Sequence, residues 1–363
     1  MKRELGISIY PDHSDPKKDR AYLKKAAALG YTRLFMSMLE VKEDKQKVSE
    51  KFGAIISFAK DLGFEVILDI APALFTDLAI SYDDLSFFAQ LGADGIRLDE
   101  GFDGNKEALL SYNPEGLAIE LNMSNDVAYL DNILSYQANE PFIYGCHNFY
   151  PQAGSALPYD FFVSCSQRFK RHGIKTAAFV TSQTAKYGPW DVNDGLPTLE
   201  LHRHLPLELQ ARHLFATNLI DTVIIGNAYV SDEELAQMAA VDRYKLSLGI
   251  EFVPQATALE RKIVADQKHF RRGDITKNVV RSTQVRVKYA TELNPPHDNK
   301  QEFQVGDVVV GNDEFGKYKN ELQIVLVPHS DPRKNLVGQI PSEELMLLDF
   351  IKPWTKFQFL PKN

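Results

Sequence analysis

Short apolar segments alternate with amphipathic segments along the first two thirds of the chain. The apolar runs, rich in Val, Ile and Leu, predict strands that are buried on both faces. They span residues 5–10, 32–39, 65–71, 95–100, 117–122, 142–147, 175–181 and 221–227. Between them, apolar residues spaced three and four apart predict helices. These helices span residues 15–29, 44–62, 82–91, 105–111, 126–137, 159–172, 207–216 and 232–241.

Cap residues mark several of these boundaries. Gly92 follows a helical segment, as expected for a residue that ends a helix. Ser231 is a natural N-cap for the last helix, and Ser124 or Asn125 is a candidate N-cap for the helix at 126–137.

The repeat of strand and helix indicates the fold class. Eight such units within about 240 residues have the size and rhythm of a (β/α)8 TIM barrel, an α/β fold. A doubly wound sheet would more often carry a glycine-rich phosphate loop after its first strand. Here the first strand leads into residues 10–15, which read YPDHSD, so we predict the barrel.

The sequence changes in character after Tyr244. Segments at 279–287, 307–310 and 321–327 are β-rich and are separated by Gly, Pro, Asn and Asp turns. They predict a small β-barrel or sandwich. We therefore expect a TIM-barrel catalytic domain at 1–243 and a small β-barrel domain at 244–363 that contributes to substrate or phosphate binding.

Two neighbouring predicted strands end in acids. Residues 95–100 read GIRLDE and residues 117–122 read LAIELN, so period-2 alternation gives each strand an apolar face and a polar face. Asp99 and Glu120 lie on the polar faces. Acids are unexpected in strands buried on both sides, and the strand ends of such a barrel build its active site.

Polar residues occur at most of the other strand ends as well. The set comprises Ser8, Tyr10, Asp12, Ser37, Glu40, Asp69, Arg97, Asp99, Glu100, Glu120, Asn122, His147, Asn148, Tyr150 and Asn227. It contains no His-x-His pair and no lysine placed for a Schiff base, so we expect neither a metal nor a cofactor. Carboxylates dominate the set, which favours acid/base chemistry.

Some of these residues also have structural interpretations. Arg97 and Asp99 could form a buried ion pair, and Asp69 could orient another group. His147 and Asn148 could cap the turn that follows their strand.

Two further segments are candidates for ligand binding. The loop at 182–206 is long enough to be a lid or a binding loop, and it brings Trp190, Glu200 and Arg203 together, a set suited to a charged sugar. The alternative is a surface insertion. In the second domain the basic segment at 268–283 contains Arg281, Ser282 and Thr283, which could bind a phosphate or form a solvated surface.

Composition narrows the choice of partners. The chain has 363 residues and a net charge of -8, which gives no general attraction to nucleic acid or to an anionic membrane. Only two cysteines are present, too few for a disulfide framework. No apolar run has the length of a secretion signal or a membrane span, so we expect a cytoplasmic protein.

Several motifs resemble those of one bacterial family. They are LGISIYP at 5–11, LDEGF at 98–102, IELNMS at 119–124, HNFYP at 147–151, GLPTLELHR at 195–203, RGDITKNVVRSTQVR at 272–286 and YKNELQIVL at 318–326. Together they resemble the 6-phospho-N-acetylmuramidases, a glycoside hydrolase family once labelled as outer surface proteins. The resemblance implies a TIM barrel followed by a cyclophilin-like β-barrel. It also implies hydrolysis of the disaccharide N-acetylmuramic acid 6-phosphate–N-acetylglucosamine during cytoplasmic cell-wall recycling. Asn320 stands where the family has Gly.

We therefore expect a cofactor-independent glycosidase in which one carboxylic acid protonates the leaving sugar and a second carboxylate acts as nucleophile or base. The predicted pair is Glu120 and Asp99, with Glu100 and Glu200 as substitutes. The expected substrate-binding residues are Asp69, Arg97, Asn122, His147, Asn148, Tyr150, Arg203, Asn227, Arg281, Ser282 and Thr283. The muramoyl N-acetyl group is an alternative nucleophile.

Other functions stay open at this point. A sugar-phosphate isomerase or aldolase could use the same barrel, and a non-catalytic sugar-binding protein is the alternative outside enzymes. The oligomeric state does not follow from the sequence. We also expect the small domain to close over the barrel mouth.

Overall fold

The computed structural model describes residues 1–39, 41, 44–125, 127–266 and 268–361. The chain forms two compact units, Met1–Val241 and Asp242–Asn363. The observed boundary, after Val241, lies two residues before the expected boundary after residue 243. Glu40, one of the predicted strand-end residues, lies outside the described residues.

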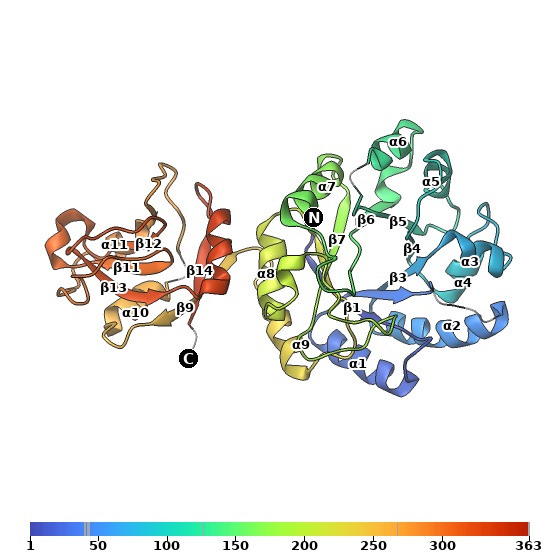
Figure 1. Cartoon of the computed structure of the whole chain (residues 1–363), viewed down its shortest axis with the longest axis horizontal. Helices are drawn as coiled ribbons and strands as arrows, with labels where there is room; N and C mark the ends of the chain where they lie inside the picture. The colour runs from blue at the N-terminus through green and yellow to red at the C-terminus, as the bar shows by residue number, and fades with distance from the viewer. Residues whose placement is uncertain (40, 42–43, 126, 267, 362–363) are drawn as a thin grey trace. The chain divides into compact units, whose positions relative to one another are not determined.

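The first unit is a closed barrel of eight parallel strands in sequence order, which confirms the predicted TIM barrel (Figure 1). The strands are β1 (Glu4–Ile9), β2 (Arg33–Ser37), β3 (Glu65–Ile70), β4 (Gly95–Leu98), β5 (Ala118–Asn122), β6 (Ile143–Cys146), β7 (Lys175–Val180) and β8 (Thr222–Ile225). β8 pairs with β1 and closes the ring.

Helices surround the barrel (Figure 1). They are α1 (Pro16–Ala28), α2 (Lys45–Asp61), α3 (Pro72–Asp77), α4 (Ser86–Leu91), α5 (Asn105–Leu110), α6 (Tyr129–Ser135), α7 (Tyr159–Arg171), α8 (Leu207–Ala216) and α9 (Asp232–Ala239), with 3-10 turns η1 (Glu140–Phe142) and η2 (Glu200–His202). In α2 the buried residues Val48, Phe52, Ile55 and Ile56 are spaced three and four apart, so the helix buries one apolar stripe.

The helix caps agree with the sequence at some ends and differ at one. The Ser231 side chain accepts a hydrogen bond from the backbone N–H of Glu234, which confirms it as the N-cap of α9. The N-cap predicted at Ser124 or Asn125 is wrong, because α6 begins at Tyr129 after Ala128. The Ser124 hydroxyl is used elsewhere: it accepts a hydrogen bond from the backbone N–H of Asn148 at 2.8 Å.

Strand stagger decides how deep each inward-facing residue lies. Asp69, Arg97, Glu120, Tyr144 and Lys175 are register partners on five successive strands. Asp69 is next to last in β3, whereas Glu120 is in the middle of β5 and Lys175 is the first residue of β7. Because tilted strands are staggered in a closed barrel, this row descends from the C-terminal end of the barrel to its N-terminal end.

The second unit contains one six-stranded sheet of order β10-β12-β11-β13-β9-β14. Its strands are β9 (Leu246–Phe252), β10 (Val279–Ser282), β11 (Asp307–Gly311), β12 (Leu322–Val325), β13 (Lys334–Gln339) and β14 (Phe357–Pro361). The remaining elements are α10 (Ala258–Val264), α11 (Gln284–Lys288), η3 (Asp313–Tyr318) and η4 (Ser342–Phe350). The cyclophilin-like barrel implied by the resemblance stays an expectation.

The strand predicted at 279–287 is too long. β10 ends at Ser282, and α11 follows. Val285 is 1% exposed and Val287 is 67% exposed, a difference that a helical turn allows, whereas a strand would put both on one face. Asn320 has a φ of 61°, a left-handed conformation that Gly and Asn tolerate, so the exchange from Gly is compatible with this turn.

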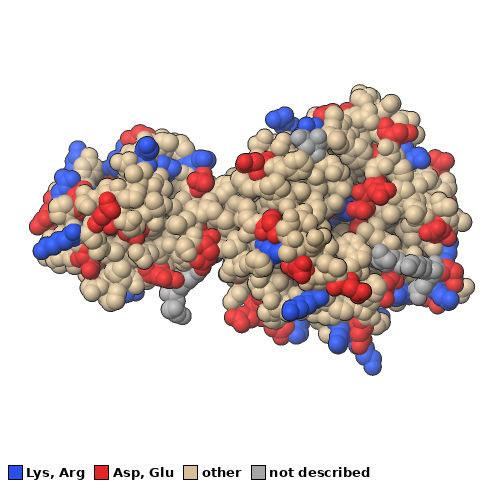
Figure 2. Space-filling model, viewed as in Figure 1, with Lys and Arg blue, Asp and Glu red and all other residues tan. Residues whose placement is uncertain are grey.

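Charged side chains of both signs lie on the visible surface. Figure 2 shows acidic and basic side chains interspersed over the visible face of each unit. Within the described parts of the chain, no helix combines the length and apolar composition needed to cross a bilayer.

Two glycines allow a matched stability test of the barrel. A Cβ on Gly95 would lie 2.6 Å from the carbonyl oxygen of Ala118 and from Cδ1 of Ile67, so Gly95→Ala should destabilise the protein by about 1–3 kcal/mol. A Cβ on Gly53, inside α2, would meet only Leu91 at 3.9 Å. Gly53→Ala should therefore stabilise by about 0.5–1 kcal/mol. Urea unfolding measures both, and an equally stable Gly95→Ala variant would contradict the close β4–β5 packing.

Candidate active site

A pocket of about 400 Å³ opens where several barrel strands end. Its lining residues are Leu39, Asp69, Arg97, Asp99, Asn148, Phe149, Tyr150, Pro151, Phe179 and Trp190. They come from the C-terminal ends of β2, β3, β4, β6 and β7 and from the loops that follow. This is the end of a TIM barrel at which active sites are built.

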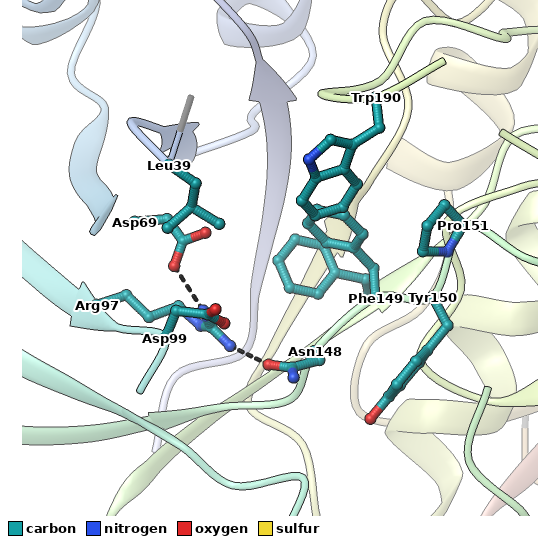
Figure 3. Close-up of a pocket in the computed structure, with 10 residues that line it drawn as sticks. Leu39, Asp69, Arg97, Asp99, Asn148, Phe149, Tyr150, Pro151 and Trp190 are labelled. Atoms are coloured by element: carbon teal, nitrogen blue, oxygen red, sulfur yellow. Dashed lines mark hydrogen bonds and ion pairs between the residues drawn. The ribbon is translucent and has the colours of Figure 1, made fainter. Parts of the chain in front are cut away.

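One guanidinium organises the polar side of this pocket (Figure 3). Arg97 donates through Nη1 to Asp69 Oδ1 at 2.5 Å and to Asp99 Oδ1 at 3.2 Å. Its Nη2 donates to Oδ1 of Asn148. The ion pair considered for Arg97 and Asp99 is thus present, and it lies within the pocket. Both carboxylates are neighbours because their oxygens lie within 3.2 Å of the same nitrogen.

The two acids differ in their access to water. The side chain of Asp69 is 3% exposed and that of Asp99 is 34% exposed. Burial, and to a smaller extent the charge of Asp99, raises the pKa of Asp69 to about 6, in spite of the opposing effect of Arg97. Asp69 therefore holds its proton up to a higher pH than an ordinary aspartate.

Aromatic rings form the other side of the pocket (Figure 3). The ring centroids of Phe149 and Trp190 are 5.7 Å apart, and Phe149 also packs edge-on against Phe179 at 4.9 Å. Trp190 remains 38% exposed. The pocket thus combines a carboxylate side with an apolar side on which a sugar ring can stack.

Two further predicted residues, Asn122 and His147, lie next to pocket residues without lining the pocket. The side-chain N–H of Asn122 donates to the backbone oxygen of Asp99 at 3.1 Å. His147 is fully buried between Ser124, at 3.1 Å from Nδ1, and Ser166, at 2.8 Å from Nε2. Burial lowers the pKa of His147 to about 3, so the ring is neutral. Neither Asn122 nor His147 lines the pocket.

Glu200 and Arg203 form an ion pair that holds loops. Arg203 donates to both carboxylate oxygens of Glu200, at 2.6 and 2.7 Å. Its remaining N–H groups donate to backbone oxygens of Tyr150, Gln152, Asp194 and Gly195. Hydrogen bonds from Arg203 lower the pKa of Glu200 to about 2.

Of the remaining predicted site residues, only Tyr150 lines the pocket. Glu200 and Arg203 are absent from the pocket lining. Asn227 is fully buried and accepts hydrogen bonds from Thr181 Oγ1 at 2.8 Å and from the backbone N–H of Ser182 at 3.0 Å. Glu100 is exposed and also lies outside the lining.

Glu120 lies deeper in the barrel than its place in a strand-end motif indicates. Its carboxylate accepts a hydrogen bond from Nη2 of Arg33, and both side chains are 1% exposed. Glu120 does not line the pocket. The partner was missed because Arg33 is 87 residues away in the sequence, although an arginine at the start of an apolar strand was a signal that could have found it.

Arg33 belongs to a chain of charges at the N-terminal end of the barrel. Its Nη1 lies 2.9 Å from Glu65, and Glu65 lies 2.9 Å from Lys175. Lys175 also contacts Glu4 at 2.8 Å. Together with the group around Arg97, this makes five carboxylates and three cations inside or at the ends of the barrel. The excess of negative charge is a physical reason for Asp69 to keep a proton.

The candidate phosphate residues of the second unit do not form one cradle. Arg281 and Ser282 are adjacent in β10, so their side chains point to opposite faces. Ser282 is fully buried and its hydroxyl lies 2.9 Å from Nδ1 of His269. Arg281 donates to Glu321 at 2.7 and 3.1 Å. Thr283 Oγ1 is buried without a hydrogen-bond partner among the described residues.

The sequence reasoning missed the aromatic residue Phe149 and the pocket residues Leu39, Pro151 and Phe179. Phe149 follows the predicted residue Asn148 directly, so the HNFYP segment contained the signal. Within the described residues, no group of three His, Cys, Asp or Glu side chains is arranged to hold a metal ion.

The Arg33–Glu120 pair can be tested by stability. Glu120→Leu leaves the buried Arg33 with less compensation and should destabilise the protein by about 3–5 kcal/mol. The double variant Arg33→Met/Glu120→Leu should recover much of this loss, because it removes both charges. Urea unfolding measures the free energy of unfolding of wild-type protein and of the two variants.

A stable Glu120→Gln protein whose turnover falls by orders of magnitude would instead support the acid role expected from the sequence.

Comparisons with known proteins agree with the fold and identify relatives. The chain is similar to an uncharacterised B. cereus protein of known crystal structure, with 55% identity and a TM-score of 0.93 over 99% of this chain and 100% of that one. It also shares its fold with a conserved Enterococcus faecalis protein of unknown function, with 24% identity and a TM-score of 0.72 over 99% of this chain and 97% of that one. A search of curated proteins finds no match.

Family models cover nearly the whole chain. The model described as 6-phospho-N-acetylmuramidase, N-terminal, matches residues 5–240, and the model described as 6-phospho-N-acetylmuramidase, C-terminal, matches residues 246–360. The first match covers the barrel that carries the pocket, and the second covers the six-stranded unit. The chain therefore belongs to the 6-phospho-N-acetylmuramidase family.

Proposed function

We propose that this chain hydrolyses the glycosidic bond of a 6-phosphorylated muramoyl sugar, such as N-acetylmuramic acid 6-phosphate–N-acetylglucosamine, in the barrel pocket. The observation that carries the proposal is the pair of neighbouring carboxylates, Asp69 and Asp99, held by one arginine in that pocket. Membership of the family supports the substrate class.

The two carboxylates suit different roles. Asp69, buried and with a raised pKa, acts as the general acid that protonates the leaving sugar oxygen. Asp99, which is a third exposed, acts as the nucleophile or base, or stabilises an attacking N-acetyl group. In this proposal Asp69 takes the acid role that strand position alone assigned to Glu120, because Glu120 pairs with Arg33 away from the pocket lining.

The remaining pocket residues position the sugar. The rings of Phe149 and Trp190 stack against an apolar sugar face, while the Asn148 amide and the Tyr150 hydroxyl bind hydroxyl or acetamido groups. Arg97 holds Asp69, Asp99 and Asn148 in their relative orientation. Holding the reacting groups in place is a large part of such catalysis.

The wider setting follows from the same family. We infer a cytoplasmic role in peptidoglycan recycling, in which the substrate is a phosphorylated amino-sugar disaccharide. We also infer that the second unit is a cyclophilin-like domain. Its six-stranded sheet is compatible with that class.

The reaction can be tested directly with the phosphorylated disaccharide. Wild-type protein should release N-acetylglucosamine, and Asp99→Asn should lower kcat by about 10²–10⁴-fold because an amide cannot act as nucleophile or base. Chromatography of the products measures the rate. Glu100→Gln, which changes the next and exposed acid, is the matched control and should keep near-normal turnover. Normal turnover in a folded Asp99→Asn protein would overturn the proposal, and the unphosphorylated disaccharide tests the need for the phosphate.

The acid role of Asp69 predicts a pH dependence. The protonated form is the active one, so kcat should be highest below about pH 6 and fall as the pH rises through the pKa of Asp69. Asp69→Asn should remove this limb and most of the activity. An aryl glycoside with a nitrophenolate leaving group needs no proton, so it should restore turnover in Asp69→Asn but not in Asp99→Asn. Failure of this selective rescue would exclude Asp69 as the acid.

A further inference from the structure

The barrel pocket is poorly suited to bind a phosphate by charge. Two of its lining residues are aspartates and the only cation among them, Arg97, already pairs with both. With Asp69 protonated, the charge of Arg97 is matched by that of Asp99, so the pocket lining offers no unpaired cation to a phosphate dianion. The described parts of the second unit, by contrast, contain a dense group of cations.

Three cationic side chains surround one aromatic ring in the second unit. The guanidinium carbons of Arg281 and Arg286 lie 5.3 and 5.2 Å from the ring centroid of Tyr318, and the ammonium of Lys317 lies 5.1 Å from it. Arg281 comes from β10, Arg286 from α11, and Lys317 and Tyr318 from η3. Three separate segments therefore bring positive charge to one place, which we call the Tyr318 cluster.

One carboxylate partly neutralises the cluster. Glu321 is fully buried and accepts hydrogen bonds from Arg281 at 2.7 and 3.1 Å, and it lies 3.6 Å from Nη1 of Arg286. A single buried charge balances one of the three cations. Arg272, with which Arg281 interacts electrostatically, is already paired with Asp274 at 2.6 Å. The cluster keeps an excess of positive charge although the whole chain has a net charge of -8.

The two arginines are held in place. Their side chains are only 19% and 21% exposed. Glu321 fixes Arg281 through two hydrogen bonds, and Arg286 donates to the backbone oxygen of Lys317 at 2.9 Å. Lys317 is exposed, but the two guanidinium groups are fixed and lose little entropy when an anion binds. This arrangement favours a binding site over a solvated surface.

We propose that the Tyr318 cluster is a binding site for a phosphomonoester, with Arg286, Lys317 and the outer face of Arg281 as donors. Arginine forks and a lysine ammonium are the groups that proteins use most often for phosphate oxygens. The site differs from the cradle predicted from the sequence, because Ser282 is buried on the opposite face of β10. The choice of a phosphorylated sugar as ligand rests on the proposed function, whereas the anion site itself does not.

Binding by the full chain tests the proposal. Calorimetric titration with glucosamine 6-phosphate and with inorganic phosphate should show saturable binding that weakens as salt is added, while glucosamine should not compete. Arg286→Gln and Lys317→Gln should each weaken phosphate binding by about tenfold or more, because each removes a charged donor. These variants carry the test, since Arg281→Gln would leave Glu321 buried without its main partner.

Two control variants make the outcome specific. Arg333→Gln removes another arginine of the same unit, paired with Asp331 at 2.9 Å, and should leave phosphate binding unchanged. Asp99→Asn should lower kcat as described above and keep wild-type phosphate affinity, so failure of the reaction and failure of the anion site are distinguishable. The proposal is overturned if wild-type protein shows no saturable binding, if Arg286→Gln and Lys317→Gln bind normally, or if Arg333→Gln loses affinity equally.

Discussion

The buried guanidinium of Arg33 is the constraint on which the barrel interior depends. An arginine at 1% exposure is tolerated only when carboxylates surround it, and here Glu120 and Glu65 supply them from β5 and β3. Glu65 also forms an ion pair with Lys175 of β7, and Lys175 forms another with Glu4 of β1. Five of the eight strands are thus joined by charge at one end of the barrel. Polar groups at the other end are left to form the pocket.

This division explains the two kinds of carboxylate in the barrel. Glu120 and Glu65 balance cations in the interior, whereas Asp69 and Asp99 share one arginine beneath an open pocket. The negative charge of Glu120 also acts on Asp69 and adds to the effect of burial on its pKa. A residue far from the pocket surface can therefore tune the chemistry that we propose for the pocket. Arg97 connects the two layers because it is the register partner of both Asp69 and Glu120.

Much of the fold could be predicted because it depends on local patterns. The eight strands are continuous apolar runs, and Ser231 caps its helix through a contact only three residues away. Asp69, Arg97, Asp99, Asn148 and Tyr150 were found as candidates because strand ends converge in a barrel, and all five line the pocket. What could not be predicted depends on geometry between strands. The depth of Glu120 follows from barrel stagger, and the partners of Glu200 and Ser282 follow from how loops and strands pack.

The ion pair between Glu200 and Arg203 has a consequence for substrate range. Arg203 joins the backbone at Tyr150 and Gln152 to the backbone at Asp194 and Gly195, so the loops after β6 and β7 are fastened to each other. These loops carry Phe149, Tyr150 and Trp190. Walls fastened in this way cannot spread to admit a larger sugar, because doing so would break several hydrogen bonds of a buried charge. Selection by size is therefore built into the pocket before any ligand arrives.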